Sequence, residues 1–111
     1  MIIHLDSDIF EVVNNNSKTI EARVNDEKRR KIKIGDKIIF LKRPDEIEKI
    51  EAIVEDLVYY KNFNDLVKDY NMEKLYLKDI DKEDFIKLLK RFYSKKEIEQ
   101  YGIVAIRFKK I

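Results

Sequence analysis

A lysine at the head of a short apolar strand pattern is the sequence feature that most constrains the fold. In a strand over residues 18–24, successive side chains face opposite ways, so Lys18 shares a face with three apolar residues. Glu21 and Arg23 lie on the other face of this strand. A charge removed from water must be paired or must serve a site. The chain must therefore fold so that this strand borders either a partner for Lys18 or a functional cleft.

Composition excludes several classes of protein. A length of 111 residues suits one domain, residues 1–111, and 44% apolar with 41% charged residues is a globular composition. The chain has no cysteine, which excludes a disulfide framework and thiolate metal sites. No apolar run approaches the roughly 20 residues of a membrane span, and the N-terminus lacks a signal-peptide pattern. We therefore expect a single cytoplasmic domain with no membrane partner.

The net charge of +2 hides an uneven distribution of charged residues. Residues 18–43 contain ten Lys/Arg and four Asp/Glu, and residues 87–111 contain eight and two. Residues 44–86, between them, contain six Lys/Arg and thirteen Asp/Glu. If the two basic segments meet in space, they form a positive face that suits an anionic partner. Otherwise these lysines and arginines form an ordinary solvated surface.

Periodicity and capping signals predict an α+β domain. Strands are expected at residues 18–24, 37–42, 47–60 (one long strand or a bent pair) and 103–108, and helices after Asp6, Asn62, Asp81 and Ser94. Ser94 and Glu97 have the spacing of a capping box, whereas residues 71–80 fit no single element. About five strands around a small core, with helices between them, indicate a compact β-barrel with short helices packed around it.

The segment Asn16-x-Lys18-x-x-Glu21-x-Arg23 resembles the G-x-K-x-x-E-x-R signature of ASCH domains, a branch of the PUA-like β-barrel superfamily. Asn16 replaces the glycine of that signature, a mild change because Asn also tolerates left-handed backbone. Further segments resemble the family in the same order, at residues 24–30, 34–40, 59–63 and 92–106. The chain thus resembles small single-domain prokaryotic ASCH proteins over most of its length.

The resemblance implies that the protein binds RNA or a nucleotide in a cleft around Lys18, Glu21 and Arg23. Arg23 suits a phosphate or a base edge, since its planar fork donates two parallel hydrogen bonds. Alternatively, Lys18 pairs with Glu21, and Glu21 with Arg23, as parts of the scaffold. No cofactor and no DNA partner are expected, and the oligomeric state is left open. The further residues expected to contact phosphates or stack on bases are Lys28, Arg29, Arg30, Tyr59 and Tyr93.

The alternative implied by the resemblance is a small hydrolase acting on a modified nucleoside or on RNA. Some small bacterial members of the family remove the acetyl group of N4-acetylcytidine, with a lysine at the position of Lys18 and a threonine nucleophile at the position of Glu21. Glu21 does not support that threonine mechanism, and the nearest hydroxyl is Thr19. In this alternative Lys18 and Glu21 are catalytic, and a Lys18→Ala variant loses turnover but keeps its fold.

Metal-dependent ribonuclease activity has also been attributed to members of this family. The single histidine, His4, predicts no metal site, because the chain has no Cys/His cluster. Glu21 with Glu51 or Glu55 would offer carboxylates to Mg²⁺ or Mn²⁺, but their spacing does not identify such a site. We therefore predict no metal ligands from the sequence.

Overall fold

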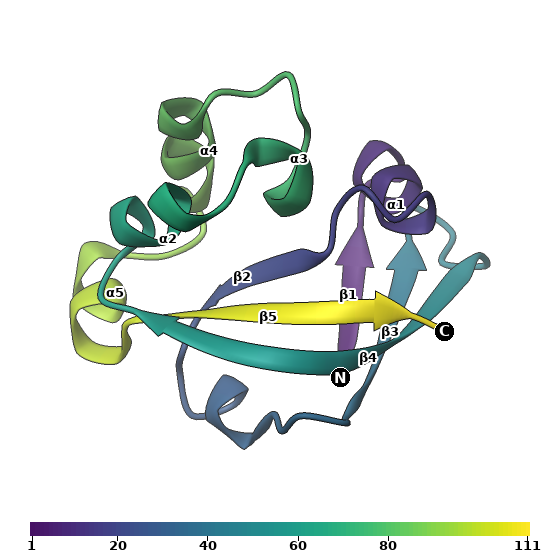
Figure 1. Ribbon diagram of the computed structural model, residues 1–111, viewed down its shortest axis with the longest axis horizontal. Coiled ribbons are helices and arrows are strands. Elements are labelled where there is room, and N and C mark those ends of the chain that lie inside the picture. Colours follow the sequence, from purple (N-terminus) through teal and green to yellow (C-terminus); the bar gives the residue numbers. More distant parts are fainter.

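A five-stranded sheet curls into a half-barrel at the centre of the molecule (Figure 1). The computed structural model describes residues 1–111. The strands are β1 (Ile2–Leu5), β2 (Ile20–Val24), β3 (Lys37–Lys42), β4 (Lys49–Tyr60) and β5 (Ile103–Lys110). Their order is β1-β3-β4-β5-β2, with β1 parallel to β3 and all other neighbours antiparallel. The expected α+β, PUA-like fold is confirmed, with β1 and β2 as the two edges of an open barrel.

Short helices connect and cover the strands. They are α1 (Ser7–Asn14), α2 (Phe63–Asp69), α3 (Met72–Leu75), α4 (Lys82–Leu89) and α5 (Lys95–Tyr101), with one 3₁₀ turn, η1 (Arg29–Lys31). The predicted caps Asn62, Asp81 and Ser94 each accept a hydrogen bond from a backbone N–H of the following helix, and Ser94 with Glu97 forms the expected capping box. None of the helices has the length and apolar character required to cross a membrane.

Two apolar cores lie on opposite sides of the curled sheet. In the first, Ile9, Phe10 and Val13 of α1 pack against β1, β3, β4 and part of β5. In the second, the apolar face of β2 packs against helices α2 to α5 and the other face of β5. These helices lie together on one side of the strands (Figure 1). Because Glu21 and Arg23 alternate with the apolar residues of β2, they lie on the side of this strand away from the second core.

The structure differs from the predicted elements in three places. The strand β1 was not predicted, because four residues beside a helix cap give little local signal and its pairing with β3 is long-range. The strand predicted over residues 18–24 begins at Ile20, so the alternation argument does not apply to Lys18. The apolar pattern after Asp81 predicts a helix that continues through Phe92, but α4 ends at Leu89 and the Phe92 side chain is 71% exposed.

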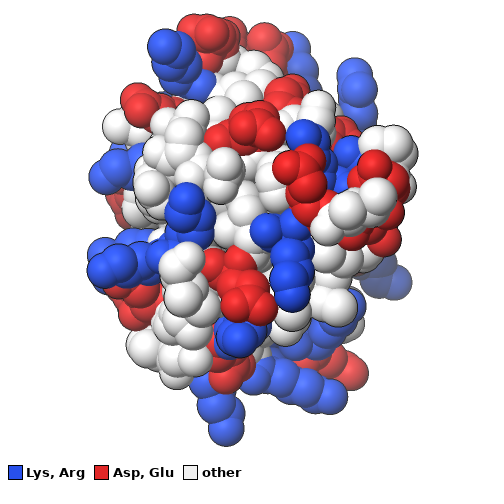
Figure 2. Space-filling model, turned by 90° about the vertical axis from the view of Figure 1, so that its right-hand side faces the viewer, with Lys and Arg blue, Asp and Glu red and all other residues white.

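The two basic segments of the sequence meet where β2 pairs with β5. They do not produce a continuous positive surface on the face shown in Figure 2, where basic and acidic side chains are interspersed. The charge on this face is therefore locally balanced, and ion pairs such as those of Lys42 with Glu11 and Glu48 are examples of such balance in the molecule.

Candidate functional site

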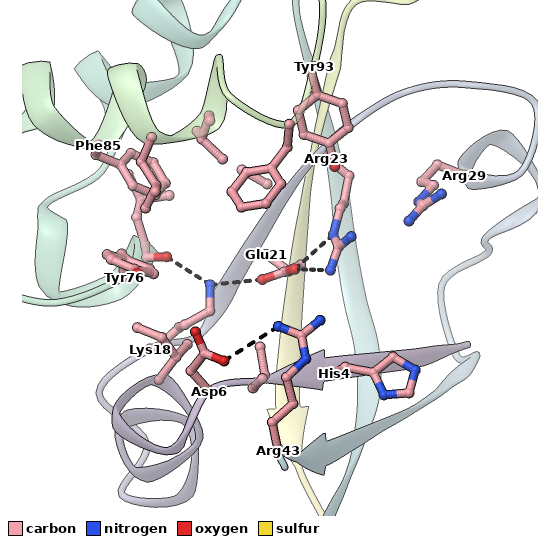
Figure 3. Close-up of a pocket in the computed structure, with 17 residues that line it drawn as sticks. His4, Asp6, Lys18, Glu21, Arg23, Arg29, Arg43, Tyr76, Phe85 and Tyr93 are labelled. Carbon is pink, nitrogen blue, oxygen red and sulfur yellow. Dashed lines mark hydrogen bonds and ion pairs between the residues drawn. The ribbon is translucent and has the colours of Figure 1, made fainter. Parts of the chain in front are cut away.

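A cavity of about 460 Å³ is lined by both edge strands of the half-barrel (Figure 3). One wall is apolar and aromatic and comes from α3, α4 and the segment that follows α4. The residues of this wall are Leu75, Tyr76, Phe85, Leu88, Leu89, Phe92 and Tyr93. The remaining surface is largely charged, and its charged residues are Asp6, Lys18, Glu21, Arg23, Arg29 and Arg43. The cavity therefore combines an apolar surface with a few convergent polar groups, as ligand sites commonly do.

A buried ion-pair cluster occupies the charged side of the cavity. The Nζ atom of Lys18 lies 3.0 Å from Oε1 of Glu21, and the two side chains are 2% and 11% exposed. The Nε and Nη2 atoms of Arg23 lie 2.8 and 2.7 Å from Oε2 of the same carboxylate. Glu21 is thus held between two cations, and each of its oxygens has a charged partner.

All three donors of the Lys18 ammonium are used within the protein. Besides its pairing with Glu21, Nζ donates to the carbonyl oxygen of Ile20 and, at 2.7 Å, to that of Leu75 in α3. Burial lowers the pKa of Lys18 from its ordinary value, whereas Glu21 opposes this shift. Because three acceptors surround Nζ, they favour the ammonium form, which alone has three N–H groups. Lys18 therefore ties the start of β2 to α3 and positions Glu21, as in the paired alternative considered above.

Glu21 stays ionised although it is buried. Burial by itself raises the pKa of this carboxyl, but Lys18 and Arg23 together lower the pKa below its ordinary value. Such a group stabilises the folded state above its unfolded pKa, which is about 4.3 for Glu. That stabilisation is lost as the pH falls through the lower, folded-state pKa.

We therefore expect the free energy of unfolding to fall more steeply below about pH 4.3 in the wild type than in a Glu21→Gln variant. The variant is less stable at neutral pH, and the two curves converge in acid. Urea unfolding followed by circular dichroism between pH 2 and 7 measures this difference. Parallel curves over the whole range would show that Glu21 is not preferentially ionised in the folded protein.

The outer edge of β2 presents backbone groups to the cavity. Phe108 N–H bonds to Thr19 C=O and Asn25 N–H to Gly102 C=O, so the odd-numbered residues of β2 are those that bond to β5. The N–H and C=O of Ala22 consequently point away from β5, and Ala22 lines the cavity. This places one backbone donor and one backbone acceptor beside the Glu21 carboxylate.

The structure brings together some of the predicted site residues. Lys18, Glu21, Arg23, Arg29 and Tyr93 all line the cavity. The Tyr93 phenol lies beside the guanidinium of Arg23 and, together with Glu21, raises the pKa of Arg23, outweighing the lowering effect of burial. These five residues come from β2 and the residues just before it, from η1 and from the segment before α5, which are separate in the sequence.

Lys28, Arg30 and Tyr59 do not line this cavity. Lys28 borders a separate surface hollow with Tyr101, and the guanidinium of Arg30 stacks over the Tyr101 ring, 5.5 Å from its centroid. Tyr59, on β4, is 61% exposed. Of the four consecutive basic residues 28–31, only Arg29 lines the cavity, because neighbouring residues of a tight turn project in different directions.

The carboxylates considered for a metal do not form a cluster. No group of three or more His, Cys, Asp or Glu side chains is placed to hold a metal ion. Glu51 pairs instead with Lys37 and Lys49, at 3.7 and 3.8 Å on the surface.

Sequence reasoning missed several residues that line the cavity. His4 and Asp6 lie on or next to the unpredicted strand β1, and Arg43 follows β3. The parallel pairing of β1 with β3 brings them together, since Arg43 N–H donates to Leu5 C=O at 2.8 Å. No local motif signals such a long-range pairing. Phe92 was noticed as an apolar residue, but its exposure follows from the end of α4 at Leu89.

A family model and several solved structures are similar to this chain over nearly its whole length. The family model for the ASCH domain matches residues 3–111. The crystal structure of the hypothetical protein PH0355 is 31% identical, with a TM-score of 0.85 over 99% of this chain and 97% of that one. The solution structure of protein PF0455 from Pyrococcus furiosus is 25% identical, with a TM-score of 0.74 over 100% and 98% of the two chains.

A more distant structure shares the fold alone. The ASCH protein from Zymomonas mobilis is 16% identical, with a TM-score of 0.63 over 97% of this chain and 65% of that one. A search among curated proteins finds no match.

Proposed function

This chain belongs to the ASCH domain family, and on that premise we propose that it binds single-stranded RNA or a nucleotide in the cavity beside Lys18, Glu21 and Arg23. The observation that supports the proposal best is the pairing of an aromatic wall with a cationic side in one cavity. A nucleotide has the same two parts, a flat apolar base and an anionic phosphate. Single-stranded nucleic acid is bound in this way, by stacking on aromatic rings and by basic contacts.

The aromatic wall offers a surface on which a base stacks. Phe92 is exposed and lies outside every helix, so its ring is available to a ligand without disturbing the core. Tyr93 is only partly exposed and also packs against Phe63, with ring centroids 6.1 Å apart. Phe92 is therefore the better residue with which to test stacking separately from folding.

The backbone of Ala22 supplies the polar contact for the base edge. Its outward N–H and C=O match an acceptor and a donor that lie side by side, a pair that every nucleobase offers. The buried pairs of Glu21 with Lys18 and Arg23 hold this part of β2 in place. In this proposal Lys18 and Glu21 are positioning residues rather than direct ligand contacts.

No specific observation favours the hydrolase alternative. The cavity is lined by no serine, threonine or cysteine, and Thr19 faces a different hollow. Burial lowers the pKa of Lys18, but its ammonium contacts three acceptors, so a Lys18 base would lose contacts that hold the start of β2 in place. We therefore propose ligand binding, rather than catalysis, as the function of this cavity.

Replacing Phe92 with Ala is expected to weaken binding of single-stranded RNA about tenfold, within the range measured for loss of one base–aromatic stack. Because Phe92 is exposed, the free energy of unfolding should change little. Fluorescence anisotropy with short labelled oligonucleotides at low salt measures the affinity. The matched control is Tyr59→Ala, which removes another exposed ring, outside the cavity.

Equal loss of affinity in the two variants would place the ligand elsewhere on the surface. Absence of any binding by the wild type, to oligonucleotides or to mononucleotides at low salt, would overturn the proposed function itself.

A further inference from the structure

We propose that Arg23, Arg29 and Arg43 form a phosphate subsite at one side of the cavity, so that the ligand must be phosphorylated. The inference rests on the proposed function and deepens it, since it selects nucleotides and RNA over nucleosides. Figure 3 shows the three guanidinium groups on the side of the cavity away from Tyr76 and Phe85. A base on the aromatic wall would thus direct its phosphate towards the arginines.

Arg29 provides the first line of support. Its side chain is 19% exposed, and its Nε–H is buried without a hydrogen-bond partner in the protein. Its only charged neighbour is Asp26, whose Oδ2 lies 3.7 Å from Nη1, beyond hydrogen-bond distance. A buried donor without a partner is costly, and a bound acceptor is one way in which such a donor is satisfied. An oxygen of a phosphate would satisfy it.

Arg23 and Arg43 supply further donors from separate elements. Arg23 uses Nε and Nη2 for Glu21, so Nη1 is the group that remains for a ligand, with the Tyr93 phenol beside the same guanidinium. Arg43 makes only a long contact of 3.4 Å with Asp6, and more than half of its side chain is exposed. Both groups can therefore donate to a ligand without losing a strong pair.

The charge of the cavity lining also favours an anion. Its cations are Lys18, Arg23, Arg29 and Arg43, whereas its carboxylates are Asp6 and Glu21. Lys18 and Arg23 together exceed the charge of Glu21, and Asp6 only weakly compensates Arg43. A dianionic phosphate monoester neutralises this excess, and guanidinium forks match its oxygens. A nucleoside would leave the arginines uncompensated.

The test compares ligands that differ only by the phosphate. The four ribonucleosides, their 5′- and 3′-monophosphates and inorganic phosphate are titrated into the protein at low salt, with affinities from calorimetry. The NMR signals of the arginine Nε–H groups are followed in parallel. We expect a monophosphate to bind at least tenfold more tightly than its nucleoside, and the Arg29 Nε–H signal to shift with monophosphate and with inorganic phosphate.

Variants then assign the preference to the arginines. Arg29→Gln and Arg43→Gln should each remove most of the preference for the monophosphate and leave the affinity for the nucleoside unchanged. Arg29→Lys keeps the charge but lacks the Nε–H, so its preference for the monophosphate should lie between those of Arg29→Gln and the wild type. The matched control is Arg107→Gln, which removes an exposed arginine outside the cavity and should have no effect.

The outcomes separate this inference from the proposed function. Equal affinities for nucleosides and monophosphates would overturn the phosphate subsite and leave nucleobase binding intact. A shift of the Arg29 signal with phosphate alone, and no added affinity from any base, would support the subsite and overturn the proposed function. An unmoved Arg29 signal with every phosphate-containing ligand would overturn the subsite.

Discussion

Replacing Lys18 with Met is expected to lower the free energy of unfolding by about 3–5 kcal/mol, the usual result of removing one partner of a buried ion pair. The variant keeps most of the side-chain volume but leaves two buried carbonyl oxygens, of Ile20 and Leu75, without their donor. Glu21 keeps Arg23 as its only cation. Since domains of this size are stable by only about 5–15 kcal/mol, urea unfolding should show a large shift of the midpoint.

The control for this prediction is Lys37→Met, which removes a lysine paired with Glu51 on the surface and should change stability by less than about 0.5 kcal/mol. In the double variant Lys18→Met/Glu21→Gln, the buried carboxylate is also removed, so the two losses should not add. A Lys18→Met variant as stable as the wild type would contradict a structural role for the ammonium.

This prediction reverses an expectation from the sequence. The hydrolase alternative required a Lys18→Ala variant that keeps its fold. Because Nζ makes three buried contacts, we expect this variant to lose stability before any effect on activity can be judged. Loss of activity or binding in any Lys18 variant is therefore informative only beside a measured free energy of unfolding.

Replacing Gly102 with Ala is expected to destabilise the protein by about 3 kcal/mol, at the upper end of the cost of strained backbone. Gly102 joins α5 to β5 with φ of 68° and ψ of −168°, a region that is essentially restricted to glycine. A Cβ atom at this position would lie 2.9 Å from the carbonyl oxygen of Tyr60, a backbone atom of the paired strand β4. Thermal and urea unfolding would both report the loss.

Gly35→Ala is the matched control. Gly35 also has a positive φ, of 94°, but a Cβ atom there would meet nothing within 4 Å. We expect a loss of about 1 kcal/mol from backbone strain alone. If the two variants were equally stable, the contact with the Tyr60 carbonyl would add nothing to the loss of stability at position 102. The backbone of β4 would then move enough to accommodate the added Cβ atom.

The elements that the sequence predicted well are those encoded by neighbouring residues. The helix starts at Asn62, Asp81 and Ser94 depend on a side chain and a backbone N–H three residues apart, so both partners are visible in one short segment. The strands β3 and β4 likewise follow from local apolar patterns. The family resemblance added the fold, which the family match and the structural relatives confirm.

The cavity depends on contacts that no local pattern contains. Lys18 and Leu75 are 57 residues apart, yet the Lys18 ammonium bonds to the Leu75 carbonyl. Arg43 reaches the cavity because β3 pairs with β1, a strand of four residues with no clear sequence signal. Sequence by itself determined most of the elements but not β1 or α3, together with the family and three neighbouring charges on β2 or just before it. Only the tertiary structure decided that the Lys18 ammonium is buried and bonded within the protein, and that three arginines from distant segments line one cavity. The physical reason is that the partners of a side chain are set by how the whole sheet curls.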